Sequence, residues 1–313
     1  MKIVFLDALS MGEGVCLDAF HQLGEFQTYL TTSPEERIAH IGDATVVLTN
    51  KVVIDKPVMD ACPSLELICI TATGKNNVDL AYAQEKGIVV KNVAGYSTAS
   101  VAQTTLMLVL SLIGQGAYYD AYVKEGLWIK APVFTHLDRS FWEIKGKRWG
   151  IIGLGTIGRE VAKIASAFGA DVVYYSASGK TYESEYAVVS LDEMLSTCEI
   201  ITIHAPLNEY THHLIGEDAF SKMKERAVLV NVGRGGIVDE AALCRVIDTK
   251  ELYVGLDVLE QEPMKAGHPL LDVTHKERLL LTPHVAWGSQ ESRTKLMELV
   301  HENIKTYLSQ RRA

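Results

Sequence analysis

The stretch from Arg148 to Ser176, RWGIIGLGTIGREVAKIASAFGADVVYYS, constrains the fold more than any other part of this sequence. A short apolar run, Trp149–Ile152, precedes a glycine-rich turn, apolar residues at helical spacing, and a second apolar run, Val172–Tyr175. This order predicts a strand, a turn, a helix and a second strand. In such a unit the pattern G-x-G-x-x-G indicates a dinucleotide site, because the turn places a helix N-terminus against the phosphates.

The three glycines of this pattern have different tasks. Gly153 permits the tight turn, Gly155 lets the backbone approach a pyrophosphate, and Gly158 lets the helix pack closely on the strand. The helix N-terminus, which includes Thr156 and Ile157, offers N–H groups and a positive dipole end to the phosphates.

Composition limits the class of protein. Hydrophobic residues make up 48% of the 313 residues, so we expect a soluble globular protein with a large core and room for two domains. The net charge of −9 argues against binding to nucleic acid or to an anionic membrane, and a small anionic substrate would need a local positive group. Five scattered cysteines favour reduced thiols in the cytoplasm over disulfides or a metal site. No signal peptide or membrane-spanning stretch is expected.

The order of short apolar runs predicts two α/β domains. In residues 1–92 the runs alternate with helical segments, including Gly14–Gln22 and Pro34–Ile41, which implies a parallel sheet with right-handed crossovers. Six more runs follow from residue 149, the number of strands in a complete doubly wound dinucleotide fold. The expected strands are Ile3–Leu6, Phe26–Leu30, Thr45–Thr49, Leu65–Thr71, Ile88–Lys91, Trp149–Ile152, Val172–Tyr175, Ile200–Ile203, Val228–Asn231, Tyr253–Leu256 and Leu279–Leu281.

A long apolar helix and an aromatic segment separate the two sets of strands. From Ser97 to Gly114 apolar residues lie on all sides of the expected helix, which favours burial between layers or domains over a membrane role. Residues 115–147 are irregular and rich in tyrosine, tryptophan and phenylalanine. They either pack on their own domain or form an arm that covers a second subunit, since aromatic residues are enriched in interface cores.

Polar side chains follow the predicted strands of the second domain, at the sheet edge where ligands of doubly wound folds bind. These are Arg234, Asp257 with Glu262 five residues later, and His284. An arginine can hold a carboxylate and polarise an adjacent carbonyl. A histidine beside a carboxylate is stabilised as imidazolium, so it can protonate an oxyanion formed by hydride transfer from a nicotinamide. Each residue alone has a plain structural alternative, but together they form a coherent candidate active site.

Six motifs lie along the chain: GLGTIG (153–158), NVGRGGIVDE (231–240), GLDVLEQEP (255–263), TPHVAW (282–287), ITATGKNNVD (70–79) and NVAGYSTASVAQ (92–103). Together they closely resemble the motifs of the D-isomer-specific 2-hydroxyacid dehydrogenases, over essentially the whole chain. The resemblance implies two doubly wound parallel-sheet domains, in which an NAD(P)-binding Rossmann domain, residues 98–286, is inserted into a smaller flavodoxin-like substrate domain, residues 1–97 and 287–313.

The same resemblance implies roles for single residues. Arg234 would bind the substrate carboxylate and carbonyl, His284 would be the acid/base, and Glu262 would support His284. A homodimer through the Rossmann domain, with residues 115–147 as its arm, is also implied. Substrate would further contact the backbone N–H groups around Thr73, Gly74 and Lys75. The implied cofactor contacts are Gly153, Gly155, Thr156, Ile157, Gly158, Ser176, Pro206, Val232, Gly233 and Asp257, the last facing the nicotinamide carboxamide.

Two residues depart from the family pattern. Gln103 stands where the family usually has glutamate, a change that we expect to affect the chemistry little. Ser176 stands where an aspartate or glutamate normally binds the ribose hydroxyls, so the usual repulsion of a 2′-phosphate is missing, and Ser178 and Lys180 could receive one. Because no arginine lies in residues 176–180, we favour NAD(H) and keep NADP(H) as possible.

The expected reaction is the interconversion of a small 2-keto acid and its D-2-hydroxy acid. The substrate-domain motifs are most similar to the glycerate dehydrogenase and hydroxypyruvate reductase branch, which implies hydroxypyruvate or glyoxylate and D-glycerate or glycolate. D-lactate or another short 2-hydroxy acid is the alternative, and Glu262 argues against a formate-dehydrogenase-like activity, whose branch has glutamine there. A remote alternative is an NAD(H)-sensing scaffold similar to the C-terminal-binding-protein corepressors, because a fold alone does not fix a function.

Overall fold

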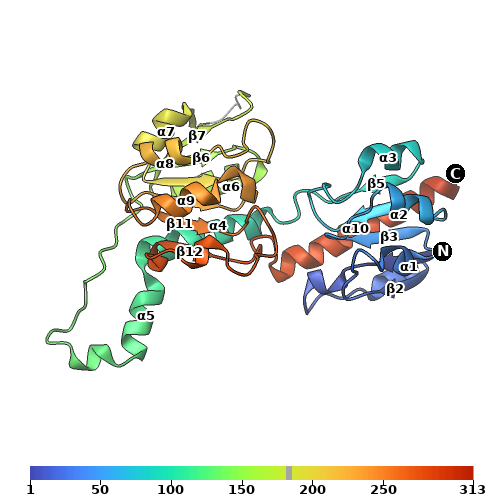
Figure 1. The fold of residues 1–313 in the computed structure, drawn as a ribbon, viewed down its shortest axis with the longest axis horizontal. Helices are drawn as coiled ribbons and strands as arrows, with labels where there is room; N and C mark the ends of the chain where they lie inside the picture. Colours follow the sequence, from blue (N-terminus) through green and yellow to red (C-terminus); the bar gives the residue numbers. More distant parts are fainter. Residues whose placement is uncertain (181–184, 313) are drawn as a thin grey trace. The chain divides into compact units, whose positions relative to one another are not determined.

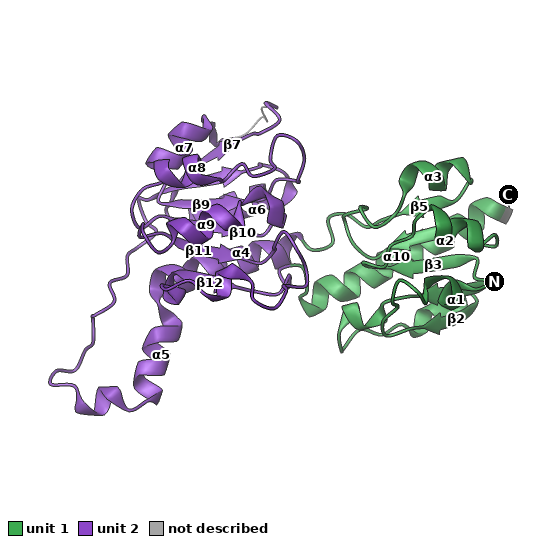
Figure 2. Ribbon diagram, viewed as in Figure 1, with its two compact units in different colours: residues 1–97, 287–313 green, residues 98–286 purple. Residues whose placement is uncertain are grey.

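The computed structural model describes residues 1–180 and 185–312, and the chain divides into two compact units. Unit 1 comprises Met1–Ser97 and Trp287–Ala313, and unit 2 comprises Thr98–Ala286 (Figure 2). Each unit is built on one parallel sheet with helices on both faces. The expected fold class, two doubly wound parallel-sheet domains, is therefore confirmed.

The sheet of unit 1 has the order β2-β1-β3-β4-β5, which is the flavodoxin-like order. Its central strands are short runs of branched apolar residues, buried on both sides because helices cover both faces. The chain passes from β1 to β2 on one side and then continues with β3 on the other, so the topological switch point lies between β1 and β3. The strands are β1 (Lys2–Phe5), β2 (Glu25–Thr28), β3 (Val46–Thr49), β4 (Leu67–Ile70) and β5 (Val89–Lys91).

Different parts of the chain cover the two faces of this sheet. One face packs against α1 (Arg37–Ile41), α2 (Lys56–Ala61) and α3 (Leu80–Glu85). The other face packs against the long C-terminal helix α10 (Gln290–Arg312) and two 3₁₀ turns, as Figure 1 shows for α10. These turns are η1 (Ala8–Met11) and η2 (Asp18–Gln22).

Two predicted helix boundaries in unit 1 were wrong. The segment expected to be helical from Gly14 forms only η2, which begins at Asp18, and Gly14 itself has a φ of +82°, outside the helical region. The helix expected from Pro34 begins only at Arg37. Its first residues form a turn in which the Ser33 N–H donates to the Glu36 carboxylate at 2.9 Å.

The sheet of unit 2 has the order β12-β11-β10-β9-β6-β7-β8, with the switch point between β6 and β9. The six predicted strands are present, but the count of six was wrong because β8 adds a seventh. This strand has only two residues, both exposed, so it produces no apolar run in the sequence. The strands are β6 (Arg148–Ile152), β7 (Asp171–Tyr175), β8 (Ala187–Val188), β9 (Ile200–Ile203), β10 (Val228–Asn231), β11 (Tyr253–Leu256) and β12 (Leu279–Leu281).

Helices cover both faces of the unit 2 sheet (Figure 1). The apolar helix α4 (Thr98–Gly114) packs directly on the sheet, where a Cβ on Gly255 of β11 would lie 3.4 Å from Leu108 and Leu112. The remaining helices are α6 (Thr156–Ala167), α7 (Leu191–Thr197), α8 (Glu217–Lys222) and α9 (Glu240–Val246), with 3₁₀ turns η4 (Gly235–Ile237), η5 (Pro269–Leu271) and η6 (Lys276–Arg278).

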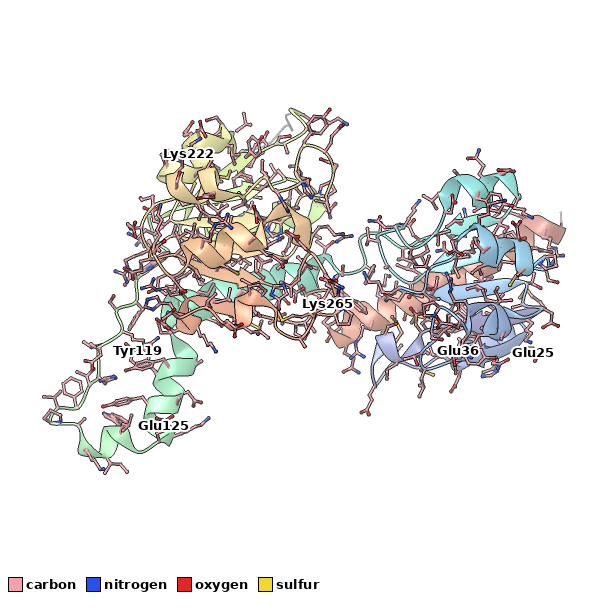
Figure 3. All side chains as sticks on the ribbon, viewed as in Figure 1. Glu25, Glu36, Tyr119, Glu125, Lys222 and Lys265 are labelled. Carbon is pink, nitrogen blue, oxygen red and sulfur yellow. The ribbon has the colours of Figure 1, made fainter. Side chains whose placement is uncertain are left out.

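Residues 115–147, here called the arm, extend from the body of unit 2 and return to it (Figure 1). They contain α5 (Gly116–Lys124), which buries none of its side chains, and η3 (Leu127–Lys130). The arm is held together by its own aromatic groups. Tyr119, labelled in Figure 3, donates to the Arg139 carbonyl, and the rings of Tyr122 and His136 stack 3.8 Å apart.

No single helix in the described part of the chain is long and apolar enough to cross a membrane. The pair α4 and α5 together reaches that length, but the two helices are bent by 59° at their junction. Because α4 packs on the sheet, its apolar character is explained by the core of unit 2.

Candidate active site

The glycine turn after β6 is closely packed against the strand β9 and its following loop. Gly153 has a φ of +93°, and a Cβ there would lie 2.9 Å from the backbone nitrogen of Ala205. A Cβ on Gly158 would lie 2.2 Å from the Gly153 carbonyl oxygen. Both positions therefore need glycine for reasons internal to the protein.

Gly155 is different, because a Cβ there would meet no protein atom within 4 Å. It is the N-cap residue of α6, and no side chain caps this helix. The N–H groups of the first turn of α6, including those of Thr156 and Ile157, have no carbonyl partner within the helix. They lie next to the open space at Gly155. This open, uncapped helix N-terminus fits the pyrophosphate of a dinucleotide.

Three more of the predicted cofactor contacts lie on the loops that follow β9 and β10. Pro206 follows Ala205 directly, and Val232 and Gly233 follow β10. A Cβ on Gly233 would lie 3.0 Å from the Ala205 carbonyl oxygen. Since Gly153 contacts the same residue, the structure brings the three loops together at the switch point of unit 2.

At the far end of the βαβ unit, Ser176 follows β7 and is half-buried. Its hydroxyl lies 3.4 Å from that of Ser178, which also accepts the Lys180 N–H at 3.5 Å. Positions 176 and 178, at this end of the βαβ unit, thus carry hydroxyl groups rather than carboxylates.

Arg234 is half-buried on the loop between β10 and η4. The amide of the buried Asn231 fixes this loop, since its oxygen accepts the Gly233 N–H at 3.0 Å and its nitrogen donates to the Arg234 carbonyl at 2.8 Å. The next residue, Gly235, lies against the loop that follows β11, because a Cβ on it would be 1.9 Å from the Leu259 carbonyl carbon. The loop carrying Arg234 is therefore packed on the loop carrying Glu262.

Glu262 and His284 are in direct contact, although 22 residues separate them in the sequence. The distance from His284 Nδ1 to Glu262 Oε2 is 2.7 Å, and Glu262 Oε1 accepts the Leu259 N–H at 3.0 Å. Both carboxylate oxygens are thus engaged, and Nδ1 of the imidazole is occupied by Glu262. Because Glu262 occupies Nδ1, Nε2 is the ring nitrogen left to act on a ligand. A ligand can reach the pair, since 28% of the His284 side chain and 31% of the Glu262 side chain are exposed.

His284 has an unusual backbone conformation, with a φ of +54°. A non-glycine residue in this region is strained and persists only where its surroundings fix it. Here the His284 N–H donates to the Asp257 carbonyl at 2.8 Å.

Asp257 also fixes this loop through its side chain, which the sequence did not predict. The residue is 1% exposed. Its Oδ1 accepts the Thr282 hydroxyl at 2.6 Å and the Val285 N–H at 2.9 Å, and its Oδ2 accepts the Ala286 N–H at 2.9 Å. One buried carboxylate therefore binds the Thr282 side chain before His284 and two backbone N–H groups after it.

Two other polar residues beside the site were missed as well. Glu240 is buried and accepts the Glu260 N–H at 2.6 Å, which fixes the loop after β11, while its other oxygen lies 3.0 Å from His268 Nε2. His204 follows β9, and burial lowers its pKa to about 3. His204 stands in none of the quoted motifs, and although Glu240 ends the motif NVGRGGIVDE, nothing in the sequence indicates that it binds the Glu260 N–H and His268.

Thr73, Gly74 and Lys75 belong to unit 1, where they follow β4. The Thr73 hydroxyl donates to the Val93 carbonyl at 3.1 Å, and the Thr73 carbonyl accepts from the Asn92 side chain at 2.7 Å. Within the described residues, the backbone N–H groups of these three residues donate to no acceptor. Three successive free N–H groups form a suitable receptor for a carboxylate.

Comparison with known proteins adds independent information. The profile of the family described as "D-isomer specific 2-hydroxyacid dehydrogenase, NAD binding domain" matches residues 106–286. A hydroxypyruvate reductase from Blautia hydrogenotrophica is 36% identical over 315 residues, which span 98% of this chain and 97% of that protein. A glycerate dehydrogenase from Methylorubrum extorquens is 34% identical, with 98% and 96% of the two chains covered.

Among solved structures, the chain is similar to a D-lactate dehydrogenase from Aquifex aeolicus, which was crystallised with NAD and lactic acid. The TM-score is 0.83 at 26% identity, with 99% of this chain and 96% of that one covered. The similarity therefore spans both units.

Proposed function

Because the chain belongs to the D-isomer-specific 2-hydroxyacid dehydrogenases, we propose that Arg234, Glu262 and His284 carry out the reversible reduction of a small 2-keto acid in this protein. The observation that carries this proposal is the 2.7 Å contact between His284 and Glu262, on loops packed against the loop of Arg234. When bound, the nicotinamide supplies the hydride that reduces C2 of the substrate.

The residues of this chain then handle the charge and the proton. His284 donates the proton on Nε2 to the C2 oxygen, which would otherwise become an alkoxide as the hydride arrives. Glu262 accepts from Nδ1, so it holds the ring in position and stabilises the imidazolium that exists before proton transfer. Arg234 binds the substrate carboxylate and polarises the C2 carbonyl through its planar guanidinium.

We further propose that the free N–H groups of Thr73, Gly74 and Lys75 bind the substrate carboxylate from unit 1. These N–H groups would bind the carboxylate in addition to Arg234, and the cationic side chain of Lys75 is exposed on the same segment. The domain roles follow from this assignment. Unit 2 binds the cofactor, as its match to an NAD binding domain indicates, and unit 1 contributes to the substrate site.

For the substrate we propose hydroxypyruvate or glyoxylate, and D-glycerate or glycolate in the reverse direction. Relatives that cover nearly the whole chain are named for these activities, at 36% and 34% identity. The D-lactate dehydrogenase is less similar, at 26% identity, so D-lactate is not favoured.

For the cofactor, NAD(H) is supported by the family match, and the absence of a carboxylate at Ser176 leaves NADP(H) possible. The eight candidate residues at the glycine turn and on the loops after β9 and β10 lie at one edge of the sheet, which is consistent with either nucleotide.

We also propose a homodimer in which the arm covers the partner subunit, in a reducing cytoplasmic environment that keeps all five cysteines as free thiols. The arm exposes apolar side chains that its own unit leaves uncovered, with Ile129 and Phe134 each 88% exposed. Light scattering should give twice the mass of the chain, and a double Ile129→Ser, Phe134→Ser variant should shift this towards the monomer.

The central experiment is a steady-state assay of hydroxypyruvate, glyoxylate and pyruvate with NADH and with NADPH. We expect the highest kcat/KM for hydroxypyruvate or glyoxylate with NADH, and His284→Gln should lose most turnover while binding NADH as before. Lack of NAD(P)H oxidation with every 2-keto acid would refute the enzymatic proposal. A His284→Gln variant with full activity would remove His284 from its role.

A further inference from the structure

Asp7 lies at the carboxyl end of β1, next to the switch point of the unit 1 sheet. Its carboxylate accepts three successive backbone N–H groups from the loop that follows β3, on the other side of that switch point. Oδ1 accepts from Asn50 at 2.8 Å, and Oδ2 accepts from Lys51 at 2.7 Å and from Val52 at 3.3 Å. A single side chain therefore joins the two strand ends between which ligands bind in this class of sheet.

Asp7 is half-buried, and desolvation raises the pKa of its carboxyl even though the three N–H groups act in the opposite direction. Within the described residues no lysine, arginine or histidine forms an ion pair with it. A buried carboxylate held only by backbone N–H groups is costly to desolvate, and a loop could be closed by backbone hydrogen bonds without it. The desolvation cost of Asp7 is explained if this carboxylate is needed to hold the loop after β3 in one conformation.

The loop after β3 is in turn bonded to the segment that carries Thr73–Lys75. The Asn50 side chain donates to the Thr71 carbonyl at 3.2 Å, and the Asn77 side chain donates to the Val52 carbonyl at 3.1 Å. These two asparagines hold the segment at both ends. Asp7 is thus connected, through one loop, to both ends of the turn whose N–H groups are free.

We propose that Asp7 is a positioning residue for substrate binding, which fixes the loop after β3 and, through Asn50 and Asn77, the N–H groups of Thr73–Lys75. This inference rests on the proposed function, because it takes those N–H groups as the receptor for the substrate carboxylate. The same loop presents the exposed Lys51, whose ammonium group has no partner within the described residues, towards solvent at this sheet edge. An anionic 2-keto acid is the ligand that such an edge would favour.

The test uses Asp7→Asn in the full-length protein. The amide keeps the size of the side chain but has one acceptor oxygen, so its nitrogen must face at least one of the three N–H donors. We expect KM for the 2-keto acid to rise about tenfold or more, with kcat within about threefold of wild type, because removal of a binding contact raises KM alone. The dissociation constant of NADH should be unchanged.

Amide hydrogen exchange gives a readout that does not depend on activity. In Asp7→Asn the hydrogen-bonded amides of residues 50–52, Thr71 and Val78 should exchange faster than in wild type, as the network loosens. The matched control is Asp43→Asn, which removes a carboxylate of unit 1 that pairs with Lys2 on the surface and should change neither KM nor exchange. If Asp7→Asn does not fold, Asn77→Ala removes one link without touching the buried charge and should raise KM to a smaller extent.

The outcomes separate this inference from the proposed function. Absence of turnover in the wild-type protein refutes the proposed function, and the inference with it. A wild-type protein that is active, with an unchanged KM in Asp7→Asn, refutes the inference alone. Faster exchange without a change in KM also refutes it, since it leaves Asp7 with a purely structural role.

Discussion

Replacement of Asp257 by asparagine tests whether the catalytic geometry depends on the loop around His284. The substitution conserves size, but it converts one carboxylate oxygen into an NH₂ group. In the wild-type structure both oxygens accept hydrogen bonds, two at Oδ1 and one at Oδ2, from donors 2.6 to 2.9 Å away. In either orientation of the asparagine amide, its nitrogen therefore faces at least one donor, Ala286 N–H or the Thr282 and Val285 pair.

The size of the effect follows from these contacts. A hydrogen bond to a buried charged group contributes about 1.5–3 kcal/mol, and a buried donor left without an acceptor costs about 1–3 kcal/mol. With Asp257 only 1% exposed, little water can replace the lost bond, so we expect the loop to be destabilised by about 2–4 kcal/mol. His284, with its φ of +54°, stays in its conformation only while the loop is fixed. If the whole cost is needed to restore the catalytic geometry, kcat/KM falls by about 30- to 1,000-fold.

The assay must distinguish this role from a contact of Asp257 with the nicotinamide carboxamide. If Asp257 acts through the loop, kcat falls while the dissociation constant of NADH, measured by fluorescence, changes less than about threefold. If it acts mainly on the carboxamide, the NADH dissociation constant rises in parallel with the loss of activity. Thr282→Val is the matched control, because it removes one donor and leaves the carboxylate with its two N–H partners, so it should cost less than tenfold. An Asp257→Asn variant with kcat/KM within threefold of wild type would refute the reasoning.

Glu262→Gln should lower kcat about 10- to 100-fold, because a neutral amide stabilises the imidazolium of His284 less well than a carboxylate does; a kcat within twofold of wild type contradicts the pairing. Burial raises the pKa of the Cys69 thiol to about 12, so a thiol reagent at pH 8 should modify the exposed Cys16 rapidly and Cys69 only after unfolding, as read by mass spectrometry. Burial lowers the pKa of His204 to about 3 from 6.5, so the unfolded chain binds a proton first as the pH falls and stability is lost between about pH 6.5 and 3. As the pH falls through this window, the free energy of unfolding of His204→Gln, measured by urea denaturation, should therefore rise relative to that of wild type. The same dependence of this free energy on pH in both proteins would contradict the burial of the imidazole.

The fold could be predicted well where hydrophobic burial alone determines the structure. The strands β3, β4 and β9–β11 are buried on both sides, so each of them appears in the sequence as a short run of apolar residues. The prediction failed where burial is slight. The strand β8 has two exposed residues, and only the short turn η2 forms where a helix was expected from Gly14.

In the candidate site, too, some features could be predicted from the sequence and others could not. The side chains of Arg234, Glu262 and His284 could be selected because each follows a predicted strand, and parallel strands end at the same edge. The bonds of Asp257 and Glu240 could not, because they join loops 20 to 29 residues apart in the sequence through backbone N–H groups. A backbone donor has no residue-specific signature, so only the folded loops show which carboxylate binds it.

Asp7 in unit 1 and Asp257 in unit 2 make the same kind of contact, and this contact has an electrostatic consequence. Each is a carboxylate at the end of a strand, and each fixes a neighbouring loop through backbone N–H groups instead of a cation. Within the part of the chain that the structure describes, Arg234, Lys51 and Lys75 consequently form no ion pair with a carboxylate. In a chain with a net charge of −9, an anionic substrate is repelled at long range and must be attracted locally. Under the proposed function, Arg234 in unit 2 and, separately, Lys51 and Lys75 in unit 1 are available for that attraction, since none of them pairs with a carboxylate among the described residues.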